Sequence, residues 1–194
     1  MNGDDMATKL NDILRKKKPA ILKRWLDVIS ATYSGEAAAF IKGQKNQFTG
    51  PMGYTIQEGL EGLFDGLIDE APFEEIAPFL ESIIKIRAVQ DFSPSQAVAF
   101  IFHLKKIISE ESQNTSDTRG VVDTAALTAF ELKIDTLALI SFDLYMEARD
   151  KVYQLKTNES NDMVFRLLQK ERRSCEMQEQ GLEQGPNIET PILK

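Results

Sequence analysis

The segment 121–154 reads VVDTAALTAFELKIDTLALISFDLYMEARDKVYQ, and its apolar residues follow the period of a helix with no Pro or Gly to interrupt them. At about 1.5 Å per residue such a helix is roughly 50 Å long, which is longer than a compact domain of this size. Apolar side chains cover most of its girth, so it must be covered on more than one side. We therefore expect one side to face a helical bundle and another to face a second subunit. The candidate dimer-interface residues are Phe130, Leu137, Leu139, Phe142 and Met146.

The rest of the chain shows helical periodicity as well, and no convincing alternating strand. This predicts an all-α fold. The expected elements are a short helix carrying Leu10 and Leu14, a second helix that begins at Pro19, a helix or turn over 37–47, helices over 54–69, 72–87 and 94–111, the long helix 121–154, an interruption at 157–162, a short helix over 163–169, and a mobile tail from 171 to 194.

The clearest local signal is Ser93-Pro94-Ser95-Gln96. Ser93 suits the N-cap of a helix, and Pro94 suits the first helical position, where its missing N–H has no helical partner to lose. Gln96 stands three residues after the cap, from where its side chain can reach back in a capping box. A helix is thus predicted to begin at Pro94.

Three glycines, Gly59, Gly62 and Gly66, share one stripe of the helix expected over 54–69. Each costs about 0.5–1 kcal/mol relative to Ala inside a helix, so the stripe needs a reason. Close packing within the domain or a dimer is the first interpretation. A ligand groove is the alternative.

Composition and charge exclude several classes of protein. The 194 residues carry a formal net charge of −7, which disfavours nonspecific nucleic-acid binding. There is no secretory signal at the N-terminus and no apolar run of about 18 residues, so we expect a cytoplasmic protein without membrane insertion. Residues 1–52 have a net charge of +4 and residues 53–91 of −7. The basic cluster 15–18 could form a solvated face, or touch an anionic surface or an acidic patch on another subunit.

The residues needed for most catalytic and metal chemistry are scarce. The single histidine, His103, and the single cysteine, Cys175, are 72 positions apart. A zinc site needs three or four such ligands, and a nucleophile needs an adjacent base. We expect no catalytic residue, no metal site and no cofactor, haem included; the protein is not expected to be an enzyme.

Four residues could instead line a small-molecule site. Arg87 could supply charge, and Trp25 or Tyr54 a flat wall, while His103 could touch a ligand or respond to pH. The structural alternative is that Trp25 and His103 pack in or at the edge of the core. Arg87 would then pair with Asp91, four residues later.

The segment 86–98, IRAVQDFSPSQAV, resembles the amino-terminal domain of the RsbT co-antagonist (RsbRD) family, the sensor modules of bacterial stressosome proteins. Weaker similarities support it: Ile21-Leu22-x-x-Trp25, the segment 48–53, the segment 62–67 and Asp143-x-Tyr145-Met146-x-x-Arg149. Together they cover about residues 20–155.

The resemblance implies a globin-like helical bundle of about six to seven helices, without haem, that forms a homodimer. It also implies a sensory role in the stress response and in signal transduction, with an unknown signalling protein as partner. Family members continue into a STAS domain, whereas about 40 residues without strand patterns follow the long helix here. We therefore expect a free-standing sensor or adaptor, organised as an arm (1–18), an RsbRD-like domain (19–156) and an extension (157–194). A ligand-binding sensor remains the alternative.

Overall fold

The computed structural model describes residues 3–35, 38, 41, 50–90, 92–113 and 124–183. Its helices are α1 (Gly3–Ser30), α3 (Pro51–Asp69), α4 (Phe73–Val89), α5 (Pro94–Gln113) and α6 (Thr124–Glu183). The prediction of an all-helical fold with a long C-terminal helix is confirmed, although the described residues hold five helices rather than six or seven. Two compact units divide the chain, Met1–Asp150 and Lys151–Lys194.

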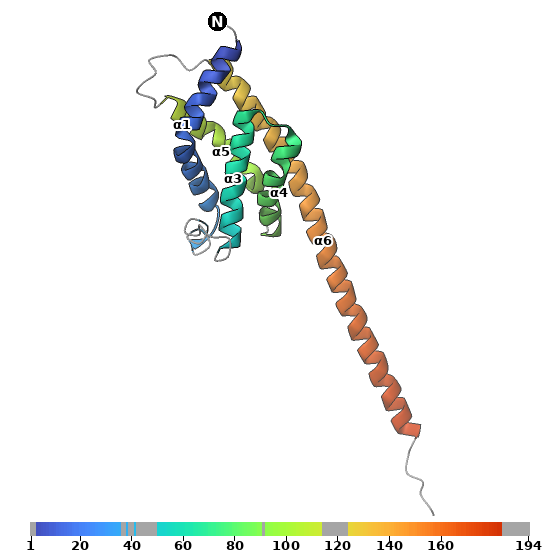
Figure 1. Cartoon of the computed structure of the whole chain (residues 1–194). Helices are drawn as coiled ribbons and strands as arrows, with labels where there is room; N and C mark the ends of the chain where they lie inside the picture. The colour runs from blue at the N-terminus through green and yellow to red at the C-terminus, as the bar shows by residue number, and fades with distance from the viewer. Residues whose placement is uncertain are drawn as a thin grey trace, which may run out of the picture. The chain divides into compact units, whose positions relative to one another are not determined.

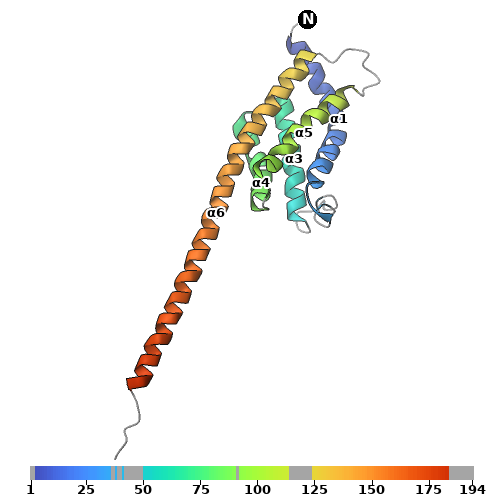
Figure 2. The same ribbon diagram turned by 180° about the vertical axis from the view of Figure 1, so that it is seen from behind.

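The first unit contains the hydrophobic core. Helix α3 packs against α4, and α1 packs against both α5 and α3 (Figure 1). The view from behind shows the first part of α6 running along this bundle (Figure 2). Residues from all five helices contribute fully buried side chains, among them Leu14, Trp25, Leu63, Leu80, Phe100 and Ile134.

Helix α1 differs from the expected pair of helices, because it runs unbroken from Gly3 to Ser30 with Pro19 inside it. An internal proline removes one hydrogen bond and costs about 3 kcal/mol. Leu10, Leu14, Ile21 and Trp25 all lie in the core, at spacings that keep them on one side of a continuous helix. Their burial offsets the cost of the proline, so the predicted break at residue 19 is wrong.

The glycine stripe of α3 is explained by packing within the domain. A Cβ at Gly62 would lie 2.5 Å from the ring of Phe79, and one at Gly66 would lie 2.6 Å from the side chain of Ile76. Both neighbours belong to α4. The first interpretation of the stripe, close approach of another helix, is confirmed.

The capping box at the start of α5 is also confirmed. The backbone N–H of Gln96 donates to Oγ of Ser93 at 3.3 Å, and the backbone N–H of Ser93 donates to Oε1 of Gln96 at 3.0 Å. Pro94 is the first helical residue, as predicted.

Helix α6 is longer than expected, because the predicted interruption at 157–162 does not occur. The residues there include Asn158 and Asn161, which are weak helix formers but lack the strong penalty of Gly or Pro. Residues 171–183 of the expected mobile tail are helical too. The remainder of that tail, and most of the segment 37–47, lie outside the described residues.

Candidate functional site

A buried guanidinium holds the corner between α4 and α5. Arg87 is fully buried near the end of α4. Its Nε donates to the carbonyl of Ala97 at 3.0 Å, and Nη2 donates to the carbonyl of Gln96 at 2.9 Å. Its Nη1 donates to Oγ1 of Thr32 at 3.1 Å, just beyond α1. One side chain therefore joins three segments of the first unit.

Aromatic rings surround the same guanidinium. Its Cζ lies 4.2 Å from the ring centre of Phe92, 5.5 Å from that of Tyr33 and 5.7 Å from that of Phe100. Burial lowers the pKa of Arg87, and the nearby Tyr33 opposes this shift. Within the described part of the chain, no carboxylate forms an ion pair with Arg87. We call Thr32, Tyr33, Arg87, Phe92 and Phe100 the Arg87 cluster; carbonyl dipoles and π-faces compensate its charge.

Helix α6 reaches this corner through two side chains. The hydroxyl of Tyr145 donates to the carbonyl of Phe92. Nη1 of Arg149 donates to the carbonyl of Ala88 at 2.8 Å, in the last turn of α4, where helix carbonyls lack partners. The end of α4, the start of α5 and the first part of α6 are thus linked by polar contacts.

The four proposed ligand residues do not form one site. Trp25 is fully buried and its indole N–H donates to the carbonyl of Phe100 at 2.7 Å, so it borders the Arg87 cluster. Tyr54 is half-buried in the first turn of α3, whereas His103 is exposed on α5. The interpretation of His103 as a residue packed in or at the edge of the core is therefore wrong, because its side chain is exposed to solvent. Asp91 lies outside the described residues.

A groove opens elsewhere in the first unit, between the end of α3, the start of α4 and α6. It measures about 300 Å³. Its lining is mostly apolar, and Lys133 and Glu70 form an ion pair at its edge with a distance of 2.6 Å. None of the four proposed ligand residues borders this groove.

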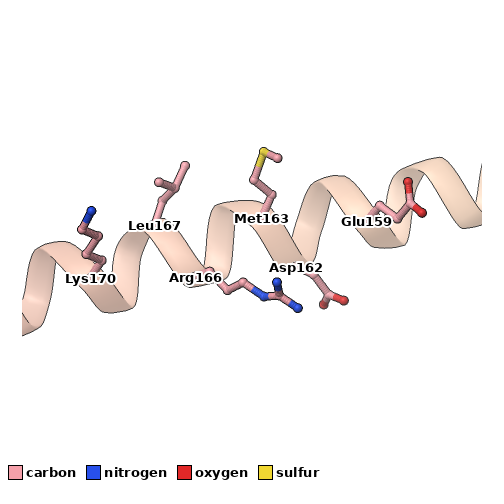
Figure 3. Close-up of a pocket in the computed structure, with 6 residues that line it drawn as sticks. All are labelled: Glu159, Asp162, Met163, Arg166, Leu167 and Lys170. Atoms are coloured by element: carbon pink, nitrogen blue, oxygen red, sulfur yellow. The ribbon is translucent and has the colours of Figure 1, made fainter.

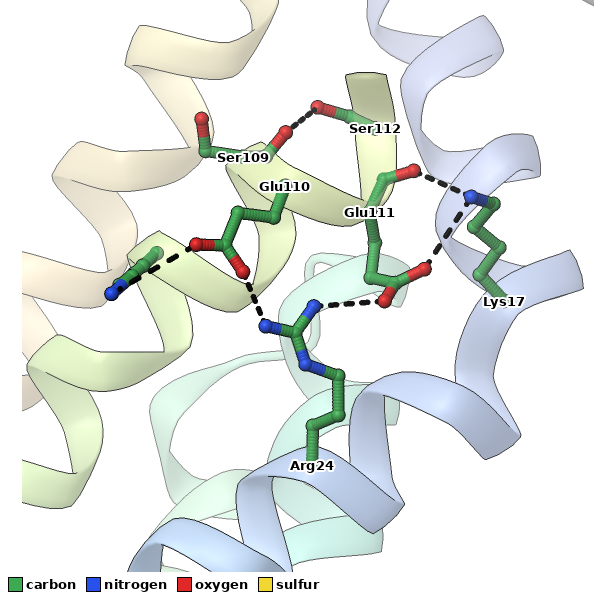
Figure 4. A network of polar contacts seen from close by, with 7 residues as sticks. Lys17, Arg24, Ser109, Glu110, Glu111 and Ser112 are labelled. Atoms are coloured by element: carbon green, nitrogen blue, oxygen red, sulfur yellow. Dashed lines mark hydrogen bonds and ion pairs between the residues drawn. The ribbon is translucent and has the colours of Figure 1, made fainter. Parts of the chain in front are cut away.

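The basic cluster of α1 pairs with acids of the same chain. Nη1 of Arg24 lies 2.9 Å from Oε1 of Glu111, and Arg24 also binds Glu110, while Nζ of Lys17 reaches Oε2 of Glu111 at 3.4 Å (Figure 4). We call these four residues the Arg24 network. The hydrogen bond from Arg24 lowers the pKa of Glu111 and of Glu110.

A second part of the basic cluster binds α3. Lys18 pairs with Asp65 at 2.8 Å and Glu61 at 2.9 Å, and Arg15 pairs with Asp69. Opposite charges of residues 1–52 and 53–91 therefore meet within the fold.

The candidate dimer-interface residues divide into two groups. Phe130 and Leu137 are buried in the core of the first unit. Leu139, Phe142 and Met146 are 70%, 43% and 41% exposed. Leu132, which was not among the candidates, is 61% exposed and lies seven residues before Leu139. Leu132, Leu139 and Met146 are spaced seven residues apart, and this repeat could have identified Leu132 as an interface candidate.

The described residues contain no group of three His, Cys, Asp or Glu side chains placed to hold a metal ion. Nor do they include a helix with the length and apolar character needed to cross a membrane.

The family model of the RsbT co-antagonist protein rsbRD N-terminal domain matches residues 19–159. The chain belongs to this family. Membership implies a regulatory, sensory role in stress signalling, and the family is not a known class of enzyme. No curated protein and no solved structure is significantly similar to the chain.

Two of the segments that resemble the family contact each other in the structure. Arg87, Phe92 and Gln96 come from the most specific motif, and Tyr145 and Arg149 come from the segment 143–149. The contacts above join these two motifs. The partners of Arg87 and Arg149 are largely backbone carbonyls, which carry no residue-type signal, so sequence analysis could not assign them.

Proposed function

We propose that the protein is a non-catalytic regulatory module that acts through protein–protein interaction as a homodimer. One observation carries this proposal: four large apolar side chains of α6 are exposed on the first unit. They are Leu132, Leu139, Phe142 and Met146, and we call them the α6 seam.

The α6 seam lies away from the core-facing side of the same helix. Ala126, Phe130, Ile134, Leu137 and Tyr145 are buried, at helical spacings that define one face. Leu132, Leu139 and Met146 recur every seven residues, with Phe142 between them, which is the pattern of a helix that pairs with another helix. Covering a large apolar side chain contributes about 1.5–3 kcal/mol, so a second copy supplies a strong driving force.

The contacts of Tyr145 and Arg149 support a regulatory role for this dimer. They tie α6 to the corner between α4 and α5, on the same part of the helix that carries the α6 seam. A signal that alters the corner would therefore act on the helix that pairs. A change at the corner of one protomer would thereby alter the dimer that a signalling partner binds.

Sedimentation of the full chain over a concentration series tests the dimer. Leu139→Lys places a charge in the seam and is expected to weaken dimerisation by about tenfold or more. Val89→Lys is the matched control, because Val89 is similarly exposed (65%) but lies at the end of α4. A wild-type chain that stays monomeric at high micromolar concentration would contradict the proposal.

The alternative, a ligand-binding sensor, is favoured by the groove between α3, α4 and α6. Its volume of about 300 Å³ and its mostly apolar lining suit a small apolar molecule. Replacing Ala71, which lines the groove between α3 and α4, by Phe would fill part of it. An apolar fluorescent probe should bind the wild type and lose affinity for this variant, with the α6 seam and dimerisation unchanged. Equal binding to both proteins would exclude this site.

A further inference from the structure

The second unit carries a stripe of charged and apolar residues. Every described side chain from Tyr153 to Ser174 is exposed. Six of them line a shallow hollow on the surface of α6: Glu159, Asp162, Met163, Arg166, Leu167 and Lys170 (Figure 3). Their spacings of three and four residues keep them along one side of the helix. We call these six residues the acid–base stripe.

The four charges of the acid–base stripe are available to a partner. Glu159, Asp162, Arg166 and Lys170 form no ion pair with another residue in the part of the chain that the structure describes. Both acids precede Met163, and both bases follow it. The stripe is therefore negative toward its N-terminal end and positive toward its C-terminal end.

This order makes the stripe complementary to itself when a second helix runs in the opposite direction. Glu159 then faces Lys170 of the other copy, and Asp162 faces Arg166. Met163 and Leu167 meet at the centre. A parallel arrangement in register would instead place each charge beside its own equivalent, and like charges facing each other are unfavourable.

We propose that the acid–base stripe binds the same stripe of a second copy in antiparallel orientation. The contact is isologous, so each charge pair and each Met163–Leu167 contact occurs twice. Exposed ion pairs contribute little individually and are screened by salt. The contact is therefore weak and salt-sensitive, and it becomes effective when another interface already joins the chains.

This second contact goes beyond the dimer proposed above and uses different residues. The α6 seam belongs to the first unit, whereas the acid–base stripe belongs to the second. Together the two contacts would assemble dimers into larger species. A chain with a broken stripe still tests the seam, and the stripe is tested as a second association step in a chain whose seam is intact, so failure of one proposal can be told apart from failure of the other.

Charge reversal in the full chain tests the stripe by sedimentation. The basic variant combines Glu159→Lys with Asp162→Lys, and the acidic variant combines Arg166→Glu with Lys170→Glu. Each should weaken the second association step by about tenfold or more, and an equimolar mixture of the two variants should restore it. Raising the salt to about 0.5 M should weaken the wild-type step as well. Thr157→Lys with Asn161→Lys adds charge on the opposite side of the helix and should have little effect.

Crosslinking tests the orientation. In a Cys175→Ser background, chains with Met163→Cys and chains with Leu167→Cys are mixed, with tags of different size. The antiparallel contact predicts disulfides between the two kinds of chain, while a parallel contact predicts Met163→Cys chains joined to one another.

Three results would overturn the proposal. The first is a wild-type chain with no association step beyond that of the seam. The second is a preference for disulfides between two Met163→Cys chains. The third is a set of charge variants that self-associate normally yet lose the capture of a different protein, which would assign the stripe to a foreign partner.

Discussion

Arg87 and Arg24 carry the same guanidinium group in opposite surroundings. Arg87 is fully buried among aromatic rings and binds carbonyl and hydroxyl oxygens. Arg24 is 38% exposed and binds the carboxylates of Glu110 and Glu111. Burial lowers the pKa of Arg87, whereas the two glutamates raise that of Arg24.

The difference shows which property of arginine each region uses. The Arg87 cluster uses the planar fork of donors, because three nitrogens reach three acceptors on two other segments of the chain. The Arg24 network uses charge, which water and salt partly screen. Substitutions that separate geometry from charge should therefore affect the two regions differently.

The largest effect is expected at Arg87. Arg87→Met should lower the free energy of unfolding by about 2–4 kcal/mol, because hydrogen bonds from a charged group are lost at a buried site. Arg87→Lys should cost at least as much, since it keeps a buried charge but cannot reach three acceptors. Urea unfolding measures both. A Lys variant clearly more stable than the Met variant would show that charge, rather than fork geometry, matters here.

Tyr145 offers a smaller test of the same corner. Tyr145→Phe removes the hydroxyl that binds the Phe92 carbonyl and leaves the ring in the core. We expect a loss of about 1 kcal/mol in the free energy of unfolding. Thermal unfolding followed by circular dichroism measures it, with Tyr54→Phe in the first turn of α3 as a control. Equal effects of the two substitutions would count against the contact.

In the Arg24 network, Glu111→Gln should cost about 1 kcal/mol, because it removes the charge that Arg24 and Lys17 share but keeps the size of the side chain. The loss should shrink as salt is added, unlike the loss at Arg87. Chemical unfolding at low and high salt compares them. A salt-independent loss would mean that packing, not charge, holds α1 to α5.

The network also predicts a pH dependence. The pKa of Glu111 is lowered in the folded chain, so its contribution is complete above the ordinary carboxyl value of 4.5 and disappears as the pH falls through the lower folded value. Wild-type stability should decline over this acid range more steeply than that of Glu111→Gln. Parallel curves for the two proteins would contradict the assignment.

Local signals in the sequence predicted local structure well. The capping box at Ser93 was correct because all its groups lie within four residues. The continuity of α1 through Pro19 was not predictable from the proline itself, because it depends on the burial of Leu14 and Ile21 against distant helices. Residues 157–162 continue the helix for a different reason: they are exposed, and they include neither Gly nor Pro, so their helix penalty is small.

Long-range polar contacts were harder to predict. Arg24 and Glu111 are 87 residues apart, and only the uneven charge of the chain hinted at such pairs. Of the candidate ligand residues, Trp25 and Arg87 meet around Phe100, but Tyr54 and His103 lie elsewhere on the first unit. The apolar pattern places Leu137 and Leu139 on different sides of a helix, yet it could not show that Leu137 is buried and Leu139 exposed.

Trp25 gives the molecule a built-in optical reporter. It is the single tryptophan of the chain, is fully buried, stacks on Phe100 with ring centres 6.1 Å apart, and binds the carbonyl of Phe100. Its emission therefore reports on the junction of α1 and α5 beside the Arg87 cluster. Neither the α6 seam nor the acid–base stripe contains a tryptophan. A change in emission when chains associate would therefore show that association alters the packing around Trp25 in the protein interior.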